Sequence, residues 1–122
     1  MENKIEFINE MKEMNESLLT MKTDLQTALN HQEDLDQKTK LIEAEMMEVI
    51  TDEVDDKFKQ IFSNADKRNA EMKIRLAKDE LYIQFKDEAK TLKKEIQELT
   101  LKIDHTLRNF KIYELLGYLS VK

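Results

Sequence analysis

The sequence contains no proline, no cysteine and no tryptophan, and it has a single glycine, Gly117. Proline and glycine mark most turns, so we expect a chain of 122 residues with so few of them to be helical nearly throughout. The lack of cysteine excludes disulfides, thiolate zinc sites and a cysteine nucleophile. The first residues lack the apolar core of a signal peptide, and no uncharged apolar run approaches the length of a membrane span. We therefore expect a cytoplasmic protein without a membrane partner.

The first half of the chain carries an apolar stripe whose members are alternately four and three residues apart. A 3.5-residue repeat sustained over many turns is typical of a coiled coil, because only a supercoil keeps such a stripe facing one partner. Asn30 and Glu33 resemble a capping box, but the unbroken phase argues against a helix break there. The stripe consists of Phe7, Met11, Met14, Leu18, Met21, Leu25, Ala28, Gln32, Leu35, Thr39, Ile42, Met46 and Val49.

After Val49 the phase shifts by one residue, and apolar residues continue at helical spacing. We therefore predict one long helix over residues 3–62. Ser63 and Asp66, beside Asn64, form a helix start signal and predict a bend or a new short helix. The shifted positions are Ile50, Val54, Phe58, Ile61 and Ala65.

The last third of the chain carries a second stripe with the same spacing, on a helix expected over residues 79–116. Asp79 is its candidate N-cap and Gly117 its expected stop. This stripe consists of Tyr82, Phe85, Ala89, Leu92, Ile96, Leu99, Ile103, Thr106, Phe110 and Tyr113. Each stripe must be buried against the other half of the chain or against another copy.

We expect an all-α protein of elongated, coiled-coil-like helices, with a long N-terminal helix and a C-terminal helix in a homo-oligomer. The two stripes supply the oligomerisation residues. These are Phe7, Met14, Leu18, Met21, Leu25, Leu35, Ile42, Leu92, Ile96, Leu99 and Ile103.

The charges divide unevenly along the chain. Residues 1–56 hold 5 lysines and 16 acidic residues, a net of -11, whereas residues 57–122 hold 15 basic and 10 acidic residues, a net of +5. We divide the chain into an acidic coiled-coil helix, residues 1–62, for oligomerisation or partner binding, and a basic helical region, residues 63–122, with an apolar tail. Such asymmetry indicates an anionic partner for the basic part, or attraction between the two halves of a helical hairpin.

Positive charge is concentrated in the segment KRNAEMKIRLAK, residues 67–78. Spaced cations on a helix can follow phosphates without reading base sequence. Phe62, Tyr82 and Phe85 flank this segment and could stack on unpaired bases, although their spacing favours packing in the core. The candidate nucleic-acid-binding residues here are Lys67, Arg68, Lys73, Arg75 and Lys78.

One enzyme motif is present in the acidic half. Glu10 and Glu13, then Glu33 and Asp36, give the patterns E-x-x-E and E-x-x-D. These resemble the magnesium site of all-α nucleotide pyrophosphohydrolases of the MazG type, where two facing helices supply the carboxylates. So acidic a segment produces such pairs by chance, and a solvated acidic face is the favoured interpretation. We expect no catalytic residue, no metal and no cofactor.

The second half also resembles a known family. EMKIRLAKDE, followed further along by LKIDHTLRNFKIYELL, resembles the C-terminal half of phage recombination mediators of the UvsY type. KIRL, residues 73–76, resembles a short basic-aliphatic motif associated with single-stranded DNA binding in that family. The resemblance covers residues 65–116, about half of the chain. The matching positions are Glu71, Met72, Lys73, Leu76, Asp79, Asp104, Arg108, Phe110, Lys111 or Ile112, and Leu115.

This resemblance implies a small helical oligomer, not an enzyme, acting in DNA recombination in the cytoplasm of a phage host. It would bind single-stranded DNA and help to load a recombinase onto strands covered by single-strand-binding protein. It adds Arg108 and Lys111 to the candidate nucleic-acid-binding residues. The acidic first half departs from the family pattern. The second hypothesis is therefore a coiled-coil adaptor or inhibitor that binds a protein partner without nucleic acid.

Overall fold

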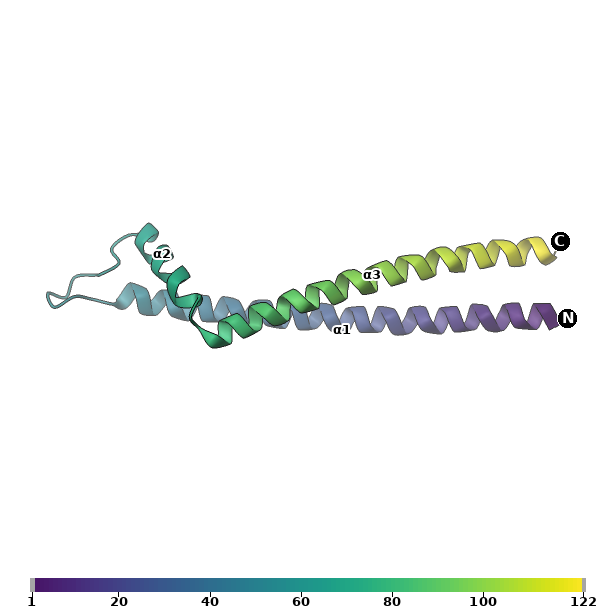
Figure 1. Cartoon of the computed structure of the whole chain (residues 1–122), viewed down its shortest axis with the longest axis horizontal. Coiled ribbons are helices and arrows are strands. Elements are labelled where there is room, and N and C mark those ends of the chain that lie inside the picture. The colour runs from purple at the N-terminus through teal and green to yellow at the C-terminus, as the bar shows by residue number, and fades with distance from the viewer. Residues whose placement is uncertain (1, 122) are drawn as a thin grey trace. The chain divides into compact units, whose positions relative to one another are not determined.

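The structure is a computed structural model that describes the backbone of residues 2–121 and the side chains of residues 4–117. Over this range it contains the helices α1 (Glu2–Asp52), α2 (Ala65–Leu76) and α3 (Glu80–Val121), drawn in Figure 1. The predicted all-α class, with a long N-terminal and a C-terminal helix, is confirmed. Within the described residues, none of the helices has a stretch that is both long and apolar enough to cross a membrane.

The chain forms two compact units. Unit 1 combines the residues up to Asn30 with those from Lys93 onward, and unit 2 consists of His31–Leu92. Each unit therefore takes residues from both sides of position 62, where composition suggested a boundary. The eleven predicted oligomerisation residues are all buried or half-buried in the chain. Assembly with further copies stays a prediction.

In unit 1 the beginning of α1 and the end of α3 run antiparallel, with their apolar stripes facing each other. Leu18 on α1 and Ile103 on α3 are buried. The rings of Phe7 and Tyr113 stack with their centroids 5.8 Å apart, and a hydrogen bond to Glu10 raises the pKa of Tyr113. Within unit 1, the two stripes are thus buried against each other in the same chain.

Gly117 does not end the last helix, as predicted, because α3 continues to Val121. The glycine is buried, and a Cβ atom at this position would overlap the Phe7 ring. The missing side chain makes room for this ring. The prediction was wrong because a helix tolerates glycine wherever packing needs the space.

In unit 2 the second part of α1 packs against α2 and the start of α3. Leu35 and Ile50 are almost completely buried, with 1% and 0% of their surface exposed, and Leu76 of α2 is also buried. Val49 is 55% exposed although it precedes Ile50 directly. The predicted change of phase is confirmed at Ile50, but the assignment of Val49 to the first stripe was wrong.

Both predicted helix starts are confirmed. Asn64 is the N-cap of α2, and its side-chain oxygen accepts a hydrogen bond from the Lys67 amide at 2.9 Å. At the start of α3, the Asp79 carboxylate accepts one from the Tyr82 amide at 2.8 Å. Such caps satisfy amide groups that have no partner within the helix. The short α2 is the predicted helix between the two long ones.

The end of α1 differs from the prediction. The helix runs unbroken past Asn30, but it stops at Asp52 instead of near residue 62. Loop 53–64 follows, in which Val54 and Gln60 form an isolated β-bridge. Val54, Phe58 and Ile61 keep helical spacing, yet they are 46%, 87% and 48% exposed. With no apolar surface to cover them, these residues do not favour a longer helix.

Candidate functional site

The candidate site lies in unit 2 and is built around α2, which contacts loop 53–64 on one side and borders the first turns of α3 on another. Arg75 joins two of these elements. Its two terminal nitrogens donate to the two carboxylate oxygens of Glu53, each at 2.7 Å, and its Nε donates to Glu71 at 2.9 Å. The guanidinium also lies 5.8 Å from the centre of the Phe62 ring. These contacts fix loop 53–64 against α2.

The same contacts change the electrostatics of Arg75. The hydrogen bonds that Arg75 donates to Glu53 and Glu71 raise the pKa of Arg75 above its ordinary value, and the hydrogen bond from Arg75 lowers the pKa of Glu53. The two carboxylates thus neutralise the positive charge of Arg75, which would otherwise attract a phosphate. Arg75 was predicted to bind nucleic acid, and the structure gives it a structural contact instead of an open cationic face.

Arg68 has a similar position. It is half-buried, and its Nη1 donates to the carbonyl oxygen of Phe62 at 3.3 Å. The two arginines of the basic segment therefore both hold loop 53–64 in place. Part of the positive charge in this segment is explained by Glu53, which comes from the acidic half of the same chain.

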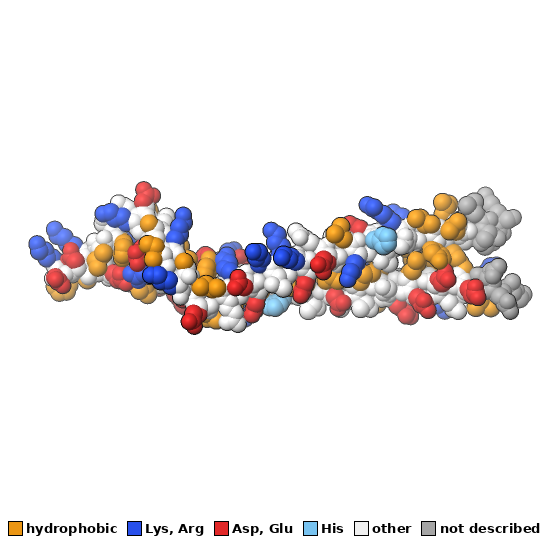
Figure 2. All heavy atoms as spheres, in the orientation of Figure 1, with side chains coloured by type: hydrophobic (Ala, Val, Ile, Leu, Met, Phe, Trp, Pro, Cys, Tyr) orange, Lys and Arg blue, Asp and Glu red, His pale blue; other side chains and the backbone are white. Residues whose placement is uncertain are grey.

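The lysines of the segment are arranged differently. Lys67, Lys73 and Lys78 are exposed, and Figure 2 shows Lys and Arg side chains over α2 and the first turns of α3. Arg108 and Lys111 are exposed on the part of α3 that belongs to unit 1, so they are not part of this site. Three of the seven predicted nucleic-acid-binding residues are thus exposed cations within unit 2, with Lys67 and Lys73 on α2 and Lys78 in the turn that follows it.

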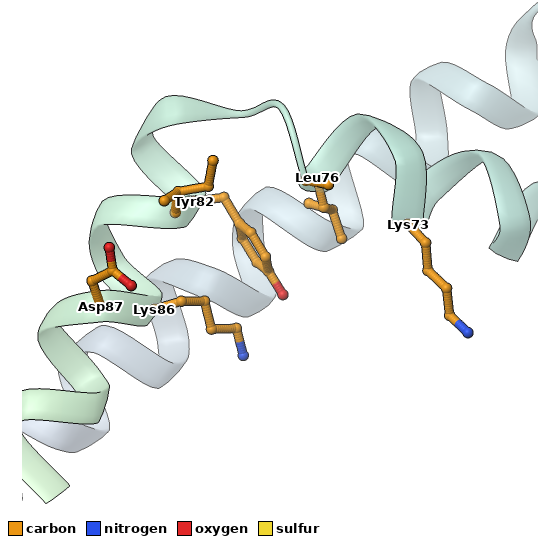
Figure 3. A pocket seen from close by; sticks show the side chains of 7 residues that line it. Lys73, Leu76, Tyr82, Lys86 and Asp87 are labelled. Atoms are coloured by element: carbon orange, nitrogen blue, oxygen red, sulfur yellow. The ribbon is translucent and has the colours of Figure 1, made fainter.

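An open hollow of about 440 Å³ lies between α2 and α3 (Figure 3). Its lining is mostly apolar, with charged side chains from both helices beside it. Figure 3 shows Lys73 on α2 and Lys86 and Asp87 on α3, with the Tyr82 ring between Leu76 and Lys86. Sequence reasoning missed this hollow, because it depends on the angle between two helices. The lining residues are Lys73, Leu76, Ala77, Tyr82, Ile83, Lys86 and Asp87.

Tyr82 and Phe85, in the first turns of α3, each contact polar or charged side chains of unit 2. The hydroxyl of Tyr82 donates to the Glu43 carboxylate at 2.7 Å, and Lys86 Nζ lies 5.4 Å from the ring centre. Burial, together with this hydrogen bond, raises the pKa of Tyr82 to about 12. Lys38 Nζ lies 5.5 Å from the centre of the Phe85 ring. Tyr82 is thus a fixed wall of the hollow.

Sequence reasoning also missed the exposed position of Phe58, because it assigned this residue to the long helix. Phe58 is 87% exposed in loop 53–64, and its φ of 61° lies in the left-handed region. The adjacent Asp55 and Asp56 are residues that favour turns, and this was the signal available in the sequence.

The acidic motifs do not form the arrangement of the MazG-type site. Glu10 and Glu13 lie in unit 1, and Glu33 and Asp36 lie in unit 2, all of them on the single helix α1. Asp36 pairs with Lys40 at 3.0 Å. Among the residues that the structure describes, no group of three or more His, Cys, Asp or Glu side chains could hold a metal ion.

Comparison of the chain with protein-family models, with curated proteins and with solved structures found no match in any of the three. The resemblance to recombination mediators of the UvsY type therefore rests on the sequence motifs.

Proposed function

We propose that this protein is a phage-type recombination accessory protein that binds single-stranded DNA through unit 2 and catalyses no reaction. The observation that carries the proposal is the hollow between α2 and α3, with an apolar wall and with Lys73 and Lys86 beside it. An unpaired strand exposes both its phosphates and the faces of its bases. Cations beside apolar and aromatic surface are the usual means of binding both.

The KIRL motif supports the same proposal. Lys73 and Leu76, its first and last residues, both line the hollow. Arg75, between them, fixes α2 to loop 53–64 through Glu53. The motif therefore supplies one cation and one apolar residue to the site, and a third side chain that holds the helix carrying them.

Unit 2 sets a limit on the strength of this binding. It contains 11 basic and 16 acidic side chains, a net of -5. Attraction of DNA must come from the local group of lysines against the charge of the unit as a whole. We expect weak binding without base specificity, which declines steeply as salt is added.

The test is fluorescence anisotropy of a labelled oligothymidylate at several salt concentrations. Each phosphate contact contributes about -0.7 to the slope of log affinity against log salt for single strands. Changing Lys73 and Lys86 to alanine should flatten this slope by up to about 1.4. The matched control changes Lys22 and Lys102, which are exposed lysines of unit 1, and should leave the slope as in the wild type.

Two results of the anisotropy experiment would contradict the proposal. If the wild-type chain shows no binding at low salt, the protein does not act on single-stranded DNA. If both double variants bind equally well, the hollow is not the binding site. Circular dichroism must show unchanged helix content in both variants.

The alternative function, a coiled-coil adaptor or inhibitor of a protein partner, is favoured by the pairing of Arg75 with Glu53. This pair accounts for part of the basic segment without DNA. An adaptor would show no anisotropy change at low salt. The first proposal also includes a homo-oligomer, and contact with a recombinase or single-strand-binding protein. Sedimentation velocity at micromolar concentration tests whether the chain forms a homo-oligomer.

A further inference from the structure

Loop 53–64 presents an aromatic side chain in an unusual way. Phe58 is 87% exposed, so no neighbour buries its ring. Its backbone has a φ of 61°, in the left-handed region that glycine and asparagine ordinarily occupy. Bulky side chains are unfavourable there, and packing does not compensate for the strain at Phe58. Strain of this kind at an exposed residue indicates a role in binding.

The turn that carries Phe58 is well defined. The Phe58 amide donates to the carbonyl oxygen of Asp55 at 3.0 Å, and the Asp55 amide donates to the carbonyl oxygen of Lys59 at 2.8 Å. The Asp55 carboxylate accepts hydrogen bonds from the amides of Lys57 and Lys59, at 2.8 and 3.0 Å. The ring is thus held outward by a closed set of hydrogen bonds.

The base of the turn is equally fixed. Ile61 donates its amide to the carbonyl oxygen of Glu53 at 3.1 Å. The Glu53 side chain is in turn held by both terminal nitrogens of Arg75. The position of Phe58 therefore depends on the same residue that fixes α2.

The charges beside Phe58 indicate what the ring meets. Lys57 and Lys59 are exposed on its two sides in the sequence. Two negative charges, on Asp55 and Asp56, lie in the same turn, and the Asp55 carboxylate is directed toward the backbone amides of Lys57 and Lys59. A ring between two cations suits a polyanion that also carries flat aromatic groups.

We propose that Phe58 stacks on one unpaired base of a single strand, while Lys57 and Lys59 contact the phosphates beside it. This inference rests on the proposed function and adds a second contact point within unit 2. It also explains why a phenylalanine occupies a position that suits glycine, because glycine would relax the backbone but provide no ring.

The first experiment uses the absence of tryptophan from the chain. In F58W the new indole is the only one, and stacking on a base should quench its fluorescence when oligothymidylate is added. The control is L101W, in which the replaced residue is 69% exposed on the part of α3 in unit 1. We expect quenching in F58W and little change in L101W at equal saturation, with binding followed separately by anisotropy of a labelled oligonucleotide.

The second experiment compares affinities. One stacked base contributes enough for the F58A and F58G variants to bind oligothymidylate about 5- to 150-fold more weakly, whereas F58Y should stay close to the wild type. The wild type and F58A should bind an abasic strand equally well. F58G should also melt at a higher temperature than the wild type, because glycine accepts the left-handed backbone. If F58G melts at this higher temperature and still binds more weakly, the loss of binding is not due to unfolding.

Three results would overturn the inference in different ways. If F58W and F58A bind the oligonucleotide like the wild type and the emission of F58W does not change, Phe58 does not stack, although the proposed function stands. If the wild type itself does not bind, the proposed function fails as well. If anionic phospholipid vesicles shift the emission of F58W to the blue and the oligonucleotide does not, the ring contacts lipid.

Discussion

Replacement of Ile50 tests the packing of unit 2 most directly. Ile50 is 0% exposed, although it lies near the end of α1 and just before loop 53–64. Truncation of a buried isoleucine to alanine removes its transfer free energy and leaves a cavity, which together cost about 2–5 kcal/mol. The better helix propensity of alanine offsets only a few tenths of this amount. The I50A variant should therefore lose a large part of the roughly 5–15 kcal/mol of a typical domain.

The matched control is the preceding residue in the same helix. Val49 is 55% exposed, and its truncation to alanine removes little buried surface. The free energy of unfolding should change by at most about 0.5 kcal/mol, as for most surface positions. The conservative change I50V should give an intermediate loss of about 0.5–1.5 kcal/mol.

Urea unfolding followed by helical circular dichroism measures all three variants. The expected result is a lower midpoint in the order Val49 control, I50V, I50A, with an unchanged dependence on urea concentration. Equal losses at Val49 and Ile50, or a larger loss at Val49, would show that the apolar stripe keeps its original phase. Such a result would contradict the burial of Ile50 and the exposure of Val49.

Three further predictions concern single contacts. The G117A change gains about 1 kcal/mol of helix propensity, but its Cβ overlaps the Phe7 ring, so it should destabilise the wild type and stabilise the F7A variant in urea unfolding. Because folding lowers the pKa of Glu53, its stabilisation is complete above the ordinary value of about 4.3 and is lost as pH falls through the lower folded value. E53Q should therefore lose less stability on acidification than the wild type, and an equal loss would contradict this. The pKa of Tyr82 is raised to about 12, so stability should decline as pH rises from about 10 toward that value, and Y82F should show a smaller decline in alkaline unfolding curves.

Spacing and capping residues predicted much of the fold. The alternation of three and four residues located both stripes, and all their described members up to Met46 and from Tyr82 are buried or half-buried. Ser63 and Asp66, beside Asn64, indicated the start of α2, and Asp79 indicated the start of α3, because short polar side chains are favoured at N-caps. Both signals depend on residues that are close in the sequence, so they can be recognised without knowledge of the tertiary structure.

The features that the sequence did not predict depend on contacts between distant residues. The pairing of Arg75 with Glu53 joins side chains 22 positions apart, and no spacing rule indicates it. Val54 and Phe58 continue a helical pattern, but α1 ends before them because nothing covers them. The fit of Gly117 against Phe7 could not be read from either residue alone.

Unit 1 is formed by two segments from opposite ends of the sequence, and this has a consequence for synthesis of the chain on the ribosome. Unit 2 is one continuous segment, whereas unit 1 needs both ends, since Phe7 stacks on Tyr113, 106 positions further along. The part of the first stripe that lies in unit 1, from Phe7 to Ala28, therefore stays uncovered until nearly the whole chain has been translated. At about 5–20 residues per second this lasts several seconds. We expect nascent chains to associate through this stripe during that interval, when translated on the same message. Crosslinking of ribosome-bound chains before and after residue 93 is made would detect such pairs.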